Sequence, residues 1–260
     1  MEQSKMPVLF LGHGSPMNAL EDTSFSEEWK SLGSQFETPR AILAISAHYA
    51  REGSFINDAK TPKQIYDMYG FPKELYAIKY TPEGDPALAK KVARLIGGSL
   101  DQSFGIDHGI WSILRRMYPQ ANIPIVSMAV NLGLTPQAMF DLGKKLAPLR
   151  QEGVLIFGTG SIVHNLSLVD WDMTEGYPWA KRFQKRLNAA IQARDYATAI
   201  HYEKDPDARK AFTTFEHYAP LLYVLGAVDP DDDVTIVNDE ETLGSISMTG
   251  YLFQSNKSVQ

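Results

Sequence analysis

A short apolar run near the start of the chain ends on a histidine that stands between two glycines: Pro7-Val8-Leu9-Phe10-Leu11-Gly12-His13-Gly14-Ser15-Pro16. An apolar run of this length is typical of a buried strand, and glycine lets the backbone turn sharply after it. In open α/β sheets, ligands bind at the carboxyl ends of the strands. For one histidine alone, a polar loop that closes the strand explains the pattern at least as well. If the pattern recurs along the chain, it predicts a ligand site at this edge of a sheet.

Apolar runs and helical patterns alternate along the rest of the chain. Further strands are predicted at residues 40–49, 123–130, 153–161, 234–238 and 244–253. Helices are predicted at residues 24–32, 86–95, 110–117, 135–149, 178–195, 196–213 and 221–227. Such alternation is typical of a mostly parallel or mixed central sheet with helices on both faces. Because no linker-like stretch divides the sequence, we expect a single α/β domain over residues 1–260.

Composition limits the partners and the chemistry. The 260 residues carry a net charge of −6 and no long basic run, which argues against nucleic acid as a partner. Because the chain has no cysteine, a metal would be held by His, Asp or Glu. The first residues lack an apolar signal region, and no apolar run reaches membrane-spanning length. We therefore expect a cytoplasmic protein that does not bind membranes.

Residues 52–80 are rich in tyrosine, glycine and proline and show no regular period. Packed loop structure explains such a segment best. An aromatic wall beside an active site is the alternative, because functional groups are often carried by loops.

The pattern of a strand followed by a histidine recurs. His13, His48 and His164 all lie just past the predicted carboxyl ends of strands, and His217 precedes a helix that must fold back onto the sheet. Neutral imidazole is the commonest protein ligand for transition metals, and a catalytic site needs several ligands and an open position. Together these histidines predict a metal site. Glu216 is the carboxylate best placed to complete a site of two histidines and one carboxylate.

His201 differs from these histidines because it lies on a polar helical stretch. A histidine in such a setting is expected at the surface. We therefore do not include it in the predicted site.

In the segments around the histidines of the predicted site, the chain resembles the class III extradiol ring-cleavage dioxygenases (the LigB superfamily), and within them the DOPA 4,5-dioxygenase branch. The resemblance implies a single α/β domain with a metal in a crevice at the edge of the sheet. It runs from about residue 6 to residue 253 and rests on motifs in the same order and at similar spacing: Leu11-Gly12-His13-Gly14-Ser15-Pro16-Met17, Ser46-Ala47-His48, Asp107-His108-Gly109, Val163-His164-Asn165, Glu216-His217-Tyr218 and Pro220-Leu221-Leu222.

The resemblance implies roles for single residues. By position, His13, His48 and His217 match the metal ligands of the DOPA branch, and Glu216 is the alternative third ligand because the wider superfamily uses a glutamate. His164 matches the catalytic base and lies close enough to the metal to be a fourth ligand before substrate binds.

His108 matches a histidine near the metal that is thought to steer oxygen or substrate. The resemblance also implies one divalent metal per chain, Zn²⁺ as isolated and Fe²⁺ for ring cleavage. The expected reaction opens a catechol such as L-DOPA with O₂ to a semialdehyde. A zinc-dependent hydrolase on the same histidines and a non-catalytic metal-binding protein are the alternatives, since Zn²⁺ on three histidines also describes a hydrolase.

Overall fold

An eight-stranded mixed sheet runs through the molecule in the order β4-β3-β5-β2-β6-β1-β10-β7. The computed structural model describes residues 5–255, so residues 1–4 and 256–260 of the predicted domain lie outside the described residues. The strands are β1 (Val8–Gly12), β2 (Ala41–Arg51), β3 (Phe55–Ile56), β4 (Ser99–Leu100), β5 (Ile125–Asn131), β6 (Val154–Gly160), β7 (Asp232–Val237) and β10 (Gly250–Ser255), with a separate ribbon of β8 (Glu241–Thr242) and β9 (Ile246–Ser247). The strands β5, β2, β6 and β1 are parallel, whereas β10 and β7 extend one edge in antiparallel pairs.

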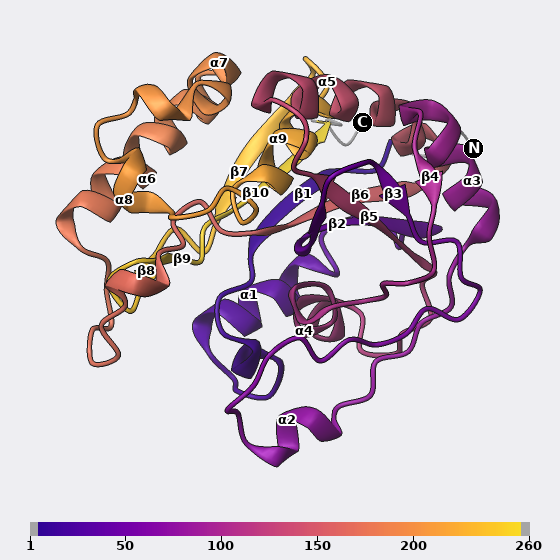
Figure 1. Cartoon of the computed structure of the whole chain (residues 1–260), viewed down its shortest axis with the longest axis horizontal. Helices are drawn as coiled ribbons and strands as arrows, with labels where there is room; N and C mark the ends of the chain where they lie inside the picture. Colours follow the sequence, from indigo (N-terminus) through magenta and orange to yellow (C-terminus); the bar gives the residue numbers. More distant parts are fainter. Residues whose placement is uncertain (1–4, 256–260) are drawn as a thin grey trace.

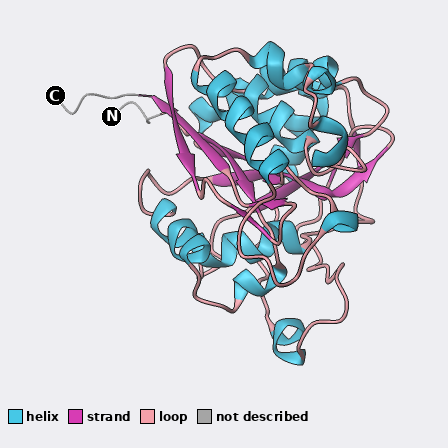
Figure 2. Ribbon diagram, turned by 90° about the vertical axis from the view of Figure 1, so that its left-hand side faces the viewer, coloured by secondary structure: helices cyan, strands magenta, loops and turns pink. Residues whose placement is uncertain are grey.

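Helices cover both faces of the sheet, as predicted (Figures 1 and 2). Their bounds are α1 (Ser24–Leu32), α2 (Lys73–Ala77), α3 (Pro86–Ile96), α4 (His108–Met117), α5 (Pro136–Leu146), α6 (Pro178–Gln192), α7 (Tyr196–Ile200), α8 (Ala208–Ala211) and α9 (Ala219–Gly226). In β1, Val8 and Phe10 join the core beneath α3, α5, α6 and α9, whereas Leu9 and Leu11 join the core beneath α1 and α4. A strand buried on both sides needs a continuous apolar run, which is what the sequence has there.

Local sequence explains several helix ends. Thr23 accepts a hydrogen bond from the backbone of Ser26, whose hydroxyl accepts one from the backbone of Thr23, and this pair caps α1. Thr135 caps α5 by accepting a hydrogen bond from the backbone of Ala138, with Pro136 in the first turn. Both starts agree with the prediction.

Several predicted elements differ from the structure, among them the helix predicted at 135–149, whose α-helical part ends at Leu146 and continues as a 3-10 helix. The predicted strand at 244–253 is divided into β9 and β10, and the predicted helix at 196–213 is two short helices. The helix predicted at 178–195 ends at Gln192 as α6, and α4 begins at His108, two residues before the predicted start. Residues 52–80 are mostly loop, with the short β3 and α2.

The histidine at residue 48 lies within its strand, and the prediction that it follows the strand end is wrong. Strand β2 continues to Arg51, and its register against β5 shifts between Ser46 and Ala50, so His48 lies in a bulge. A bulge bends a strand and redirects its side chains, and bulges are frequent beside active sites. The bulge thus brings an imidazole to the site from inside a strand.

Candidate metal centre

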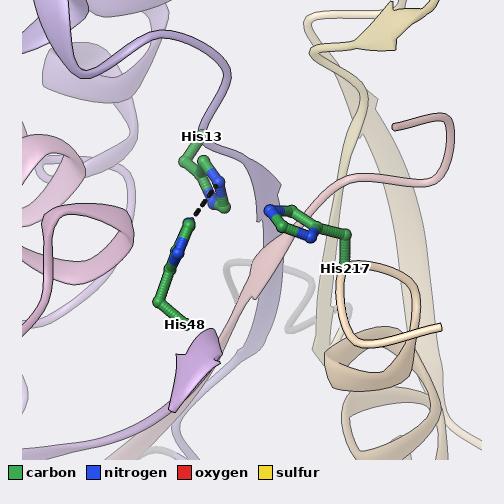
Figure 3. A group of neighbouring side chains, drawn as sticks. All are labelled: His13, His48 and His217. Carbon is green, nitrogen blue, oxygen red and sulfur yellow. Dashed lines mark hydrogen bonds between the residues drawn. The ribbon is translucent and has the colours of Figure 1, made fainter. Parts of the chain in front are cut away.

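Three histidines from distant parts of the chain meet at the carboxyl edge of the parallel strands. His13 follows β1, His48 lies in the bulge of β2, and His217 lies two residues before α9. One potential ligand atom of each lies within 4.8 Å of the others (Figure 3). The carbonyl of His217 accepts a hydrogen bond from the backbone of Ser161 (2.8 Å), which ties this segment to the end of β6.

The turn after His13 requires a glycine. Gly14 has a φ of +55°, and a Cβ on it would come within 2.3 Å of the sulfur of Met248. The left-handed backbone favours glycine, and a larger residue would also force the end of the Met248 side chain to move. The backbone conformation after His13 therefore explains why residue 14 is a glycine.

A hydrogen-bond chain sets the tautomer of His13. The hydroxyl of Thr159 donates to the carbonyl of Gly109 (3.0 Å) and lies 3.1 Å from Nδ1 of His13. Since the hydroxyl proton is already used, Thr159 accepts the bond from His13 Nδ1–H. The neutral ring then has its lone pair on Nε2.

Carboxylate oxygens lie within hydrogen-bond distance of Nδ1 in the other two rings, those of His48 and His217. Asp67 Oδ2 lies 3.1 Å from Nδ1 of His48, and Glu216 Oε1 lies 3.1 Å from Nδ1 of His217. A carboxylate favours a proton on the facing nitrogen because it can only accept. Nε2 of each ring then has no proton, and its lone pair is available to bind a metal.

The free Nε2 atoms fit a metal cation. Nε2 of His48 lies 3.1 Å from Nε2 of His13, and Nε2 of His217 is buried without a hydrogen-bond partner. Lone pairs that face one another repel unless a proton or a cation lies between them. A buried unpaired nitrogen is costly in the same way. Three neutral imidazoles with their Nδ1 atoms occupied are a common donor set for zinc and iron.

Burial keeps the rings of His13 and His48 neutral. The pKa of His13 is lowered well below 6.5, first by burial and then by the neighbouring imidazoles. Burial also lowers the pKa of His48 well below 6.5, followed by His108 and His217, while Asp67 opposes the shift. A site that disfavours imidazolium keeps its nitrogens available to a metal.

Two further histidines lie against this group. His164 stacks on His217 with ring centroids 3.5 Å apart, and its backbone N–H donates to the carbonyl of Ala211 (2.7 Å). His108 contacts the other side of the group, with its ring centroid 4.1 Å from that of His48 and 5.3 Å from that of His13. The structure therefore brings together all five histidines that the sequence singled out.

His201 stays apart, as predicted, and its half-exposed side chain lies 3.5 Å from Glu203. Glu216, the alternative third ligand, faces away from the three Nε2 atoms. It lies against Nδ1 of His217 and accepts a hydrogen bond from Thr214 (2.8 Å). These contacts hold its pKa at about 2 although burial alone would raise it.

Sequence reasoning missed two residues that contact the histidines. Thr159 lies between two glycines at the end of β6, and Asp67 lies in the irregular segment before α2. Neither residue is a histidine, and neither stands in a sequence motif that predicts a metal ligand. Asp67 had a weak signal, since residues 52–80 were considered as an active-site wall.

A cavity of about 710 Å³ lies away from the histidines, between α6 and the chain from β7 to β8. Three of its polar side chains, Gln184, Asn188 and Asp239, have hydrogen-bond partners within the chain. Asp239 accepts from the amides of Gln184 (3.0 Å) and Asn188 (2.6 Å). The oxygens of these amides accept from Ser247 and Tyr251. The histidine group is therefore the stronger functional candidate.

We expect Thr159→Val to weaken Zn²⁺ binding about 10- to 100-fold, the usual effect of losing a residue that orients a metal-bound histidine. Valine keeps the shape of threonine but cannot accept the bond from His13. Competition with a chromophoric chelator measures the change, and Thr235→Val on the exposed face of β7 is the control. Unchanged affinity in Thr159→Val would show that His13 needs no such partner.

The fold and its converging imidazoles define an α/β domain with a histidine-rich metal centre at the carboxyl edge of its sheet. Residues 7–254 match the family described as the catalytic LigB subunit of aromatic ring-opening dioxygenase. The chain belongs to this family, and it is an oxidoreductase of the aromatic ring-opening type. Its relatives depend on a metal, and its expected substrates are small aromatic molecules and O₂.

Relatives with high coverage carry consistent names. A protein of Escherichia coli (strain K12) named 4,5-DOPA dioxygenase extradiol is 39% identical, over 95% of this chain and 94% of the relative. A protein of Beta vulgaris with the same name is 34% identical over 98% of each chain. The crystal structure of an uncharacterized protein from Escherichia coli K12 superposes with a TM-score of 0.83 at 36% identity, covering 95% of this chain and 99% of that one.

In the described part of the chain, we find no helix with both the length and the apolar character needed to cross a membrane.

Proposed function

We propose that this chain, acting as one catalytic domain over residues 1–260, is an extradiol dioxygenase of the 4,5-DOPA type. It binds one divalent metal through His13, His48 and His217 and opens a catechol such as L-DOPA with O₂ to a semialdehyde. Zn²⁺ is the metal expected on isolation and Fe²⁺ the metal expected for ring cleavage. The observation that carries the proposal is the convergence of three imidazoles, two buried and that of His48 partly exposed, whose Nδ1 atoms each face an acceptor of this chain.

A divalent metal in this position supplies Lewis-acid activation of a hydroxyl group and, as iron, electron transfer to oxygen. The chain supplies the geometry and the proton relay. His164 accepts a catechol hydroxyl proton at a ring nitrogen, from its position stacked on His217. His108 contacts the opposite side of the group, next to His48, where it is placed to orient oxygen or substrate.

The test begins with metal-free protein reconstituted with Fe²⁺ under anaerobic conditions. Addition of L-DOPA and then air is expected to give a yellow semialdehyde and stoichiometric oxygen uptake. His164→Ala is expected to lower turnover by about 100-fold or more, the usual effect of losing a general base, while most metal affinity is kept. His201→Ala is the control, because that histidine is exposed and distant from the group.

A zinc-dependent hydrolase is the second candidate. One observation favours it: the potential ligand atoms of His13, His48 and His217 lie within 4.8 Å of one another, and three histidines also bind the metal in zinc enzymes. The same preparations distinguish the two. If no catechol consumes oxygen with iron bound while the zinc form cleaves a model ester, the dioxygenase proposal is wrong. If neither form turns over, the chain is a non-catalytic metal-binding protein.

A further inference from the structure

One carboxylate contacts both His48 and His108. Oδ2 of Asp67 lies 3.1 Å from Nδ1 of His48, and Oδ1 lies 3.0 Å from Nδ1 of His108. The backbone N–H of His108 also donates to Oδ1 (3.0 Å), as the first residue of α4. Oδ1 therefore accepts a hydrogen bond from the backbone of His108, while its contact with Nδ1 of the ring is an ion-pair contact and not a hydrogen bond. Electrostatic attraction at 3 Å remains.

The segment that carries Asp67 is aligned with the start of α4 by its backbone. Ile65 N–H donates to the carbonyl of Ile106, and Ile106 N–H donates to the carbonyl of Lys63 (2.8 Å each). The indole N–H of Trp111, one turn into α4, donates to the carbonyl of Ile65 (2.8 Å). These bonds align the segment with α4 in addition to the bond from the backbone of His108 to Asp67, and an asparagine oxygen at residue 67 can still accept that bond.

Asp67 presents a different carboxylate oxygen to each of the two rings, Oδ2 to His48 and Oδ1 to His108. A carboxylate has only acceptor positions, so it favours a proton on both facing Nδ1 atoms. Nε2 on the opposite edge of each ring is then without a proton.

We propose that Asp67 is a positioning residue that holds the metal ligand His48 and the neighbouring His108 in one shared orientation. A single anion fixes the tautomer of both rings, so the orientation of His108 is linked to that of a metal ligand. The assignment of His48 as a ligand rests on the proposed function; the contacts of Asp67 do not.

The test uses Asp67→Asn, which keeps the size of the side chain. An asparagine amide has one oxygen and one donating nitrogen, so it cannot present an oxygen to both rings as the carboxylate does. We expect at least one of His48 and His108 to carry its proton on Nε2. Nitrogen-15 NMR of the imidazoles in the metal-free protein reports this directly. We also expect Zn²⁺ affinity to fall about 10- to 100-fold.

Two variants separate positioning from folding. Asp58→Asn is the matched control, since Asp58 lies in the same segment and its carboxylate accepts from Gln102 (2.9 Å). Asp67→Glu restores a carboxylate and is expected to return both rings to the wild-type tautomer. A second metal-ion equivalent bound by wild-type protein and lost in Asp67→Asn would overturn the proposal, because Asp67 would then be a ligand with His48 and His108. Unchanged tautomers and affinity in Asp67→Asn would overturn it as well.

The readouts also separate this proposal from the proposed function. Ring tautomers and Zn²⁺ affinity do not require ring cleavage. If the tautomers change in Asp67→Asn while the wild-type protein loaded with iron opens no catechol, only the dioxygenase proposal fails. If catechol is cleaved and the tautomers stay the same, only the role of Asp67 fails.

Discussion

Replacing His217 with alanine is expected to abolish tight metal binding, whereas Glu216→Gln is expected to weaken it only about 10- to 100-fold, the cost of losing an orienting partner. The difference follows from where the two side chains point. Nε2 of His217 is buried without a hydrogen-bond partner next to His13 and His48 (Figure 3). Glu216 contacts Nδ1 of His217 and the hydroxyl of Thr214. Metal content after dialysis and chelator competition measure both variants.

The same comparison decides between a histidine and a glutamate as third ligand. Thermal unfolding of both metal-free variants should match that of the wild type closely enough to show that they fold. His201→Ala provides a histidine change outside the site. If Glu216→Gln loses metal as completely as His217→Ala, the glutamate of the wider superfamily is the ligand here and our assignment is wrong.

Removing Asp232 is expected to cause the largest loss of stability. Asp232 forms two hydrogen bonds with the guanidinium of Arg150 (2.6 and 2.9 Å), and both side chains are about 1% exposed. Arg150 also donates to the carbonyls of Met6 (2.7 Å) and Ala227 (3.0 Å), so it joins the starts of β1 and β7 to the end of α9. Asp232→Asn leaves a buried unpaired cation and should lower the free energy of unfolding by about 3–5 kcal/mol.

Urea unfolding at constant pH measures this change. Asp141→Asn is the matched control, because Asp141 pairs with Lys144 at the surface, where both side chains are about half exposed. An exposed pair contributes at most about 1 kcal/mol. Equal losses in the two variants would contradict the importance of the buried pair.

The stability gap between wild type and Asp232→Asn should also depend on pH. Burial raises the pKa of Asp232, but the bonds from Arg150 outweigh it, so the folded pKa is below the ordinary value. A group with a lowered folded pKa contributes fully above its unfolded pKa of about 3.9 and loses that contribution as the pH falls through the folded value. The gap should therefore be constant near neutrality and shrink in strong acid.

Several parts of the fold could be predicted from local chemistry. The apolar run before His13 predicts a strand buried on both faces, and β1 contributes side chains to both cores. Thr23 and Thr135 mark the helix starts that they cap. These features depend on neighbours in the chain, so periodicity and capping rules find them. The division of residues 244–253 was missed, because it depends on pairing with other segments: β9 pairs with β8, whereas β10 pairs with β1 and β7.

The clustered histidines could be singled out from the sequence: His13, His164 and His217 by their predicted places beside a strand or helix end, His48 although it lies inside its strand, and His108 through the family resemblance. The contacts that orient the rings could not be predicted, and Glu216 was singled out only as an alternative ligand. Thr159, Asp67 and Glu216 act through contacts with rings that are 146, 19 and 1 positions away in the chain. A hydroxyl or carboxylate has the same sequence signature whether it faces solvent or an imidazole, so only packing reveals its role.

Sequence alone was therefore enough to identify the α/β class, the strand that ends in Gly12-His13-Gly14 and the histidines that gather at one edge of the sheet. Apolar periodicity and residue chemistry carry that information locally. The tertiary structure decided which ring nitrogen faces the centre, through the bulge at His48 and the acceptors at Nδ1. Those orientations depend on hydrogen bonds between segments far apart in the chain, and such bonds exist only once the sheet has formed.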